Sequence, residues 1–205
     1  REGAVDFDVL EAAGLPGLPL AAHVTFATGA RAFQGLSSPT GQVVRRGVPI
    51  SFNLAPQGAN LCRAGWVAES EADLPAAAQG YLSDFVFPYA EAMSDWCALM
   101  RPGVAGGAVW ERMAERLPFD VFGVALNPGH LIGMDEWLSS PVSRGSEVPL
   151  RSGMAMQMDV IPSHPAFGST RIEDGYVVAD GRLRADLAAR FPEVEGRCAA
   201  RAAVM

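Results

Sequence analysis

The feature of this chain that most constrains its fold is a change in hydrophobic period near its middle. Between residues 72 and 100, apolar side chains recur at steps of three or four, which places them on one stripe of a long amphipathic helix. A second helix is predicted over residues 108–117, after a break at Arg101-Pro102-Gly103, because Pro cannot continue a helix. The stripe consists of Leu82, Phe85, Tyr89, Met93, Trp96 and Met100.

The segments on both sides of these helices have the composition and alternation of strands. Strands are predicted before the helices over residues 24–27, 48–54 and 61–67, and after them over residues 121–126, 154–161 and 171–179. Residues 35–41 are a loop by composition, and Gly181 is expected to form a turn after the last strand. Strands, two helices and further strands predict an α+β fold. The 205 residues fit one domain of ordinary size.

Charge and cysteine content exclude several classes of partner and setting. A formal charge of −7 and a pI near 4.9 oppose binding to nucleic acid, which needs clustered Lys and Arg. Cys62, Cys97 and Cys198 are too widely spaced for a disulfide framework or a cysteine metal site, so a reducing, cytoplasmic setting is expected. No apolar run approaches the roughly 20 residues of a membrane span, and from these residues no signal peptide is expected.

Three short motifs carry the candidate site: PGHLIG at 128–133, LRSGM at 150–154 and RIED at 171–174. His130 lies between Gly129 and Gly133, small neighbours that would let a ligand approach the backbone. Glu173 lies within an apolar strand, where a carboxylate costs several kcal/mol unless it is paired. Glu173 is therefore expected either in a pocket or in a structural pair with Arg171.

In that order the three motifs resemble the C-terminal half of the creatinase, prolidase and aminopeptidase P family. The resemblance implies the pita-bread fold, a curved antiparallel sheet covered by helices, as a single domain over residues 1–205. It also implies a homodimer, and it allows an N-terminal domain or a first helix outside this sequence. In the family the His, an acid after GM and the Glu of RIED converge, which makes His130, Asp159 and Glu173 the expected catalytic residues. Asp159 stands where the family usually carries the longer Glu.

The first half of the chain departs from the family. In the matching register the family's catalytic or substrate-binding His falls on Leu36, and its two metal-binding Asp residues fall on Asn53 and Ala64. A dinuclear site needs bridging carboxylates, so no bound metal and no other cofactor are expected. The expected substrate-binding residues are Asn53, Arg63, Trp137 and Arg171.

Three functional hypotheses follow. The sequence does not decide whether the chain is an enzyme. The favoured one is a creatinase-like, metal-independent hydrolase, or a related lyase, that acts on C–N bonds of a small zwitterionic or peptide-like molecule. The second is an inactive family member that binds a peptide or partner in the old cleft. The third is an Xaa-Pro-type metallopeptidase with an atypical site, of which a single metal at His130, Asp159 and Glu173 is the weaker form. His164 is a surface histidine that would replace the lost His only if the fold brought it to the site.

Overall fold

The computed structural model describes residues 2–15, 17–34 and 37–202. Its main element is a six-stranded antiparallel sheet, in which the last strand in the sequence lies at the centre. The β3–β8 pair therefore joins the first half of the chain to the second. The strands in spatial order are β1 (Thr25–Thr28), β2 (Pro49–Leu54), β3 (Leu61–Trp66), β8 (Arg171–Val177), β5 (Ala155–Gln157) and β4 (His130–Leu131), and a separate hairpin contains β6 (Ser163–His164) and β7 (Gly168–Ser169).

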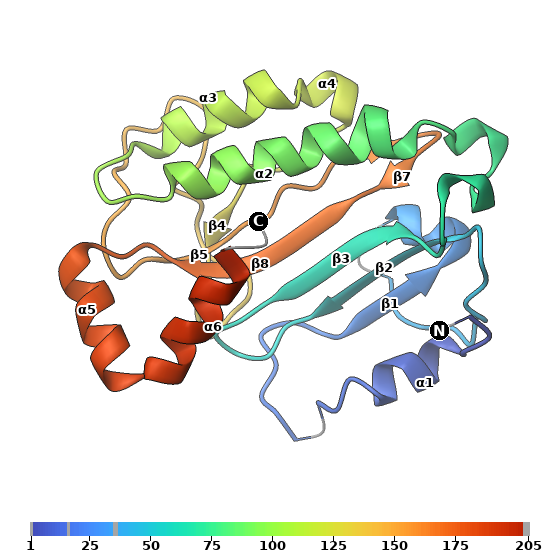
Figure 1. Ribbon diagram of the computed structural model, residues 1–205, viewed down its shortest axis with the longest axis horizontal. Helices are drawn as coiled ribbons and strands as arrows, with labels where there is room; N and C mark the ends of the chain where they lie inside the picture. Colours follow the sequence, from blue (N-terminus) through green and yellow to red (C-terminus); the bar gives the residue numbers. More distant parts are fainter. Residues whose placement is uncertain (1, 16, 35–36, 203–205) are drawn as a thin grey trace.

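The helices are distributed unevenly around this sheet. Figure 1 shows α2 and α3 side by side along one long side of the sheet, α1 near β1, and α5 and α6 at one end of the molecule. Within the described ranges, no helix is both long and apolar enough to cross a membrane. The helices are α1 (Asp6–Glu11), α2 (Phe87–Leu99), α3 (Gly106–Arg116), α4 (Phe119–Phe122), α5 (Gly181–Arg190) and α6 (Pro192–Ala202).

Along β5 and the residues that follow it, apolar side chains that point into the core alternate with polar side chains that point to the other face of the sheet. Met156 and Met158 are fully buried and pack in the same cluster as Trp96 of α2 and Met113 of α3. The intervening Gln157 and Asp159 are also buried but must point the other way, since successive strand side chains alternate between faces. The other members of this core cluster are Tyr89, Ala92, Met93, Val109, Leu117, Val142, Leu150, Val160 and Val178.

The predicted helical stripe is confirmed over its central part. Phe85, Tyr89, Met93 and Trp96 are all buried, whereas Leu82 at its start is substantially exposed. The helix begins later than predicted, because residues 71–78 form two short 3-10 turns and a π-helical turn precedes α2.

Two predictions on secondary structure were wrong. Residues 121–126 do not form a strand: α4 ends at Phe122, and Val121 is 62% exposed because Phe119 and Phe122 pack inward at helical spacing. Gly181 does not form a turn after the last strand, since it is the first residue of α5. The Asp180 side chain caps that helix by accepting a hydrogen bond from the Leu183 N–H at 2.8 Å.

Candidate active site

One face of the sheet carries the polar residues and is called the polar face here. Residues directly opposite each other in an antiparallel pair share a face. Asn53 pairs with Cys62, and Cys62 pairs with Glu173. Ala64 pairs with Arg171, two residues along each strand, so these residues also lie on the polar face.

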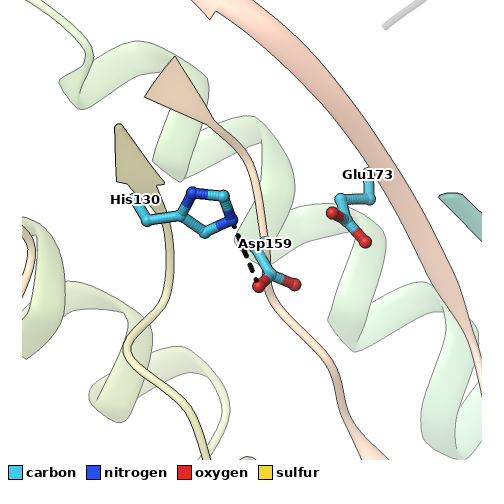
Figure 2. A group of neighbouring side chains, drawn as sticks. All are labelled: His130, Asp159 and Glu173. Atoms are coloured by element: carbon cyan, nitrogen blue, oxygen red, sulfur yellow. Dashed lines mark ion pairs between the residues drawn. The ribbon is translucent and has the colours of Figure 1, made fainter. Parts of the chain in front are cut away.

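His130, Asp159 and Glu173 meet on the polar face, as the three motifs predicted. Each is buried, and each offers a ligand atom within 4.8 Å of the others. Figure 2 shows Asp159 between the other two, with the His130 ring approaching it from β4 and the Glu173 carboxylate from β8. The Nε2 atom of His130 lies 3.6 Å from Oδ2 of Asp159. This convergence confirms their predicted placement, whereas their catalytic role stays a prediction.

Three further polar residues belong to the cluster and were not predicted from the sequence. The Oε1 atom of Glu136 lies 3.5 Å from His130 Nε2. The amide nitrogen of Asn60 donates to Glu136 Oε1 at 2.8 Å and to Glu173 Oε1 at 2.7 Å, so one amide links two carboxylates. The Gln157 amide also donates to Glu173 Oε1, at 3.3 Å. Glu136 and Asn60 lie outside the strands, where hydrophobic periodicity does not predict the direction of a side chain. Gln157 could have been predicted from the sequence, because it alternates with the apolar Met156 and Met158.

Burial and mutual proximity shift the protonation of this cluster. Burial raises the pKa of Asp159 above its ordinary value, and the Glu136 carboxylate adds to the effect. Burial also raises the pKa of Glu173, with the Asp159 charge as the next cause. Burial lowers the pKa of His130, but Glu136, the Leu131 carbonyl and Asp159 outweigh it, so the net pKa is raised.

The hydrogen bond at the other ring nitrogen fixes the orientation of His130. Its Nδ1 atom lies 2.9 Å from the Leu131 carbonyl oxygen, which can only accept, so Nδ1 carries a proton. Nε2 therefore faces Glu136 and Asp159, and it has no hydrogen-bond partner in the described part of the chain. A buried ring nitrogen and nearby carboxylates are suited to exchanging a proton with a bound molecule.

A pocket of about 310 Å³ opens beside the cluster. Asn53 and Glu136 form its inner wall, and the half-exposed Trp137 lines it, as does His23. This size is at the lower end of the range for small-molecule sites. Asn53 and Trp137 thus line the same pocket, and their contact with a substrate stays a prediction.

The expectation that Arg63 belongs to the site requires correction. Arg63 pairs with Ile172 and lies on the opposite face of the sheet from Cys62 and Glu173. Its guanidinium forms an ion pair with Asp174 at 2.8 Å, and Asp174 also pairs with Arg201 of α6. The one-residue offset from the polar-face positions 62 and 64 directs this side chain away from the pocket.

The glycines around His130 also have a different role from the one expected. Gly129 has φ near +121°, and a Cβ there would come within 3.0 Å of the Gln157 carbonyl and 3.1 Å of the Trp96 ring. At Gly133 a Cβ would come within 3.1 Å of Leu138. These glycines allow the chain to pack closely against its own core and loop.

The remaining histidine of the motif region is structural. Backbone N–H groups of Ala166 and Phe167 donate to Nδ1 of His164, and its ring stacks on Phe167 with 4.6 Å between centroids. His164 therefore does not replace the lost family His. Leu36, the position of that His, lies outside the described residues.

The donor set does not fit the two metal ions that the resemblance implies. Ala64 offers no ligand atom, Asn53 is neutral, and Oε1 of Glu173 already accepts hydrogen bonds from two amides. The ligand atoms of His130, Asp159 and Glu173 lie close enough together to hold one cation.

Comparison with solved structures identifies the fold. The chain is similar to the prolidase of Pyrococcus horikoshii OT3, with a TM-score of 0.70 and 19% identity over 87% of this chain and 52% of that one. Similar values hold for the prolidase of Pyrococcus furiosus (TM-score 0.69, 19% identity, 88% of this chain, 54% of that one). For Pseudomonas aeruginosa aminopeptidase PepP, the TM-score is 0.68, with 16% identity over 87% of this chain and 48% of that one. No protein-family model and no curated protein sequence matches the chain.

These similarities show that the chain has the pita-bread fold of prolidases and aminopeptidases P, as the sequence motifs predicted. The chain spans about half the length of the solved structures that it matches.

Proposed function

We propose that this domain is a metal-independent hydrolase that cleaves a C–N bond in a small zwitterionic or peptide-like molecule. The observation that carries the proposal is the buried His130 between the carboxylates of Glu136 and Asp159, beside a pocket bordered by Glu136. The fold is shared with proteins named prolidase and aminopeptidase. Asn53 and Ala64 stand at the positions of the family's two metal-binding Asp residues. Their inability to serve as anionic metal ligands supports a reaction carried out by side chains without a metal ion.

The proposed reaction uses two groups that already face each other. Asp159 Oδ1 is buried and without a hydrogen-bond partner, and it accepts a proton from the attacking water. The water oxygen bonds to the carbon of the scissile bond while His130 Nε2 donates its proton to the leaving nitrogen. The C–N bond then breaks, and the proton on Asp159 returns to His130 across the 3.6 Å between them.

Asn60 and Gln157 keep the third acid out of this exchange. Their amides hold Oε1 of Glu173, so its carboxyl group is fixed in orientation. Glu136, which faces both the pocket and His130, is placed to attract a cationic amino or guanidino group of the substrate.

The experiment is a turnover assay in the presence of a chelator, with dipeptides that end in proline and with creatine-like guanidino acids. We expect activity to survive chelation, and His130→Ala to reduce it by about 10²–10⁴-fold. His164→Gln is the matched control, because His164 lies in an aromatic cluster away from the pocket, and its loss should leave turnover per folded molecule unchanged.

A second candidate rests on the closeness of His130, Asp159 and Glu173, which would hold a single divalent cation. Such an ion would polarise a carbonyl oxygen or activate water. Activity that is lost on chelation and restored by one equivalent of metal would replace the first proposal with this one. Absence of turnover on both substrate classes, with ligand binding retained, would favour a binding protein derived from the same fold.

The cellular location, the oligomeric state and the partners remain the ones expected from the sequence. We infer a cytoplasmic homodimer that acts on a small molecule or short peptide and has no nucleic-acid partner. Sedimentation at micromolar concentration tests the dimer.

A further inference from the structure

The pocket beside the cluster has acidic and aromatic walls, and no arginine of the described ranges lines it. Two of its lining residues, Asp135 and Glu136, are acids, and Asn53, Trp137, His23 and two alanines complete the lining. The sequence contains no lysine, so no flexible ammonium group of the chain can reach into the pocket. Acids without a cationic side chain beside them favour a positively charged ligand.

Asn53 gives this pocket a buried acceptor that no group of the described chain satisfies. Its residue is 3% exposed, and its Oδ1 atom has no hydrogen-bond partner in the described ranges. The side chain lines the pocket because β2 places it on the polar face, opposite Cys62. A buried acceptor without a donor is costly, so a ligand in this pocket is expected to donate a hydrogen bond to it.

Glu136 supplies the negative charge for the same ligand. Its Oε1 atom accepts a hydrogen bond from Asn60 at 2.8 Å and lies 3.5 Å from His130 Nε2. Among the described residues, His130 is its one ion-pair partner, and no arginine neutralises it. A cation in the pocket would therefore meet a buried carboxylate whose orientation the Asn60 amide already fixes.

Trp137 adds an indole ring that the protein leaves open. The residue is 57% exposed and lines the pocket. The chain places Arg144 over Trp110, with the guanidinium carbon 5.7 Å from the ring centroid, but no guanidinium of residues 2–15, 17–34 and 37–202 lies over Trp137. Trp is the aromatic side chain that attracts cations most strongly, so this ring is free to receive the cationic end of a ligand.

We propose that this pocket is a subsite for an organic cation that carries N–H donors, the alkylammonium end of the ligand. The ammonium group donates hydrogen bonds to Asn53 Oδ1 and to the Glu136 carboxylate, and the carbon chain beside it lies on the Trp137 ring. A quaternary ammonium lacks the N–H that Asn53 requires, and a neutral alcohol lacks the charge that Glu136 attracts. The inference rests on the proposed function for the reaction carried out at the site, but it concerns binding and can be tested without turnover.

The first test follows the indole N–H of Trp137 by NMR. The sequence has four tryptophans, so the indole cross-peak that is missing from Trp137→Leu belongs to Trp137. In a chelator, at pH 7 and constant ionic strength, n-butylammonium should shift this peak and leave those of the other tryptophans in place. n-Butyltrimethylammonium should bind at least about tenfold more weakly, because it cannot donate hydrogen bonds, and n-butanol should not shift the peak. Equal binding of the quaternary cation, an equal shift with n-butanol, or an unmoved Trp137 peak would overturn the proposal.

The second test measures what the Trp137 ring contributes. At about five times its Kd, n-butylammonium should raise the melting temperature of the wild type by about 2–4 °C, because a ligand that binds only the folded state stabilises it. Trp137→Leu should weaken binding by about two- to fivefold, the usual effect of a cation–π contact at an exposed site, so the rise should fall by about half. Phe87→Leu is the matched control: Phe87 is also 57% exposed but lies on α2 and does not line the pocket, so this variant should keep the full rise. A full rise in Trp137→Leu, or a reduced one in Phe87→Leu, contradicts the proposal.

One variant separates this inference from the proposed function. His130→Ala removes the proposed proton donor but leaves Asn53, Glu136 and Trp137 in place, so n-butylammonium should still shift the Trp137 peak. A chain that binds n-butylammonium and hydrolyses nothing would retain the cation subsite and lose the hydrolase proposal. Turnover without any binding of n-butylammonium would do the reverse.

Discussion

At the scale of single residues, Asn60 shows how this chain keeps two buried carboxylates together. Its one amide nitrogen donates to both Glu136 and Glu173, at 2.8 and 2.7 Å. Hydrogen bonds to charged groups contribute about 1.5–3 kcal/mol each, and a buried acceptor left without its donor is costly. The Asn60 amide thus links the two carboxylates of Glu136 and Glu173, as a bridging metal ion would link carboxylates in a metal site.

Asn60→Asp should lower the free energy of unfolding by about 2–4 kcal/mol at pH 7, because it removes the amide that donates to Glu136 and Glu173 and adds a fourth acid to the cluster of Glu136, Asp159 and Glu173. The variant raises the folded-state pKa of its neighbours further, so the penalty is small at acidic pH and grows as pH rises. Urea unfolding at pH 5 and pH 8 measures the difference. Asn127→Asp, at an exposed position, should change stability by less than about 0.5 kcal/mol at either pH. Equal losses at the two pH values would contradict the account of Asn60.

At the scale of elements, the start of α1 is fastened to a distant loop by one carboxylate. Asp6 accepts hydrogen bonds from the backbone N–H groups of Thr40 and Gly41, at 2.8 and 2.9 Å. Burial raises the pKa of Asp6, but these backbone donors and Gln42 outweigh it and hold the pKa below its ordinary value. The loop over residues 40–42 and the helix should therefore separate together in acid.

Asp6→Asn should reduce the free energy of unfolding by about 1–3 kcal/mol at neutral pH, since a charged acceptor is replaced by a neutral one. The folded-state pKa is depressed, so the stabilisation is present above the unfolded pKa of about 3.9 and is lost as pH falls through the folded value. The difference between wild type and variant should accordingly disappear in acid. Asp8→Asn, exposed on the same helix, provides the control and should follow the wild type throughout.

The same scale shows which parts of the molecule a sequence can predict. Asp159 was placed correctly because its neighbours Met158 and Val160 are apolar and packed in the core, which leaves only one direction for the acid. Glu173 was placed correctly from the RIED motif, since its neighbours Ile172 and Asp174 are an exposed side chain and an ion-paired acid. Arg63 was misplaced because its strand alternates imperfectly, and a shift of one residue reverses the face. Glu136 and Asn60 lie in segments without a period, so only the fold brings them to His130.

At the scale of the whole molecule, the balance of charges on the polar face limits how many cations the protein can hold. Ala64 and Asn53 remove two anions, and the buried Arg171 adds a positive charge nearby. A second divalent ion would therefore enter a region without compensating carboxylates.

We expect elemental analysis after dialysis to find no more than one equivalent of Mn, Co or Zn per chain. Ala64→Asp alone should not raise this number, because the new carboxylate pairs with Arg171. Asn53→Asp together with Ala64→Asp should raise it, if those two losses alone ended binding of a second ion. Two equivalents bound to the wild type would refute the expectation directly.

The face opposite the polar face is not covered evenly, and this affects how the protein should be handled. Over β1 and β2 a groove of about 430 Å³ is lined almost entirely by apolar side chains, among them Leu10 of α1, Phe26 and Phe52. Environment-sensitive naphthalene dyes bind such grooves, so the native protein should fluoresce with them before any unfolding. A melting curve recorded with such a dye would begin from a high baseline and fall where most proteins rise. Substituting Glu for Ala13, which also lines the groove, should lower that baseline while leaving the circular dichroism spectrum unchanged.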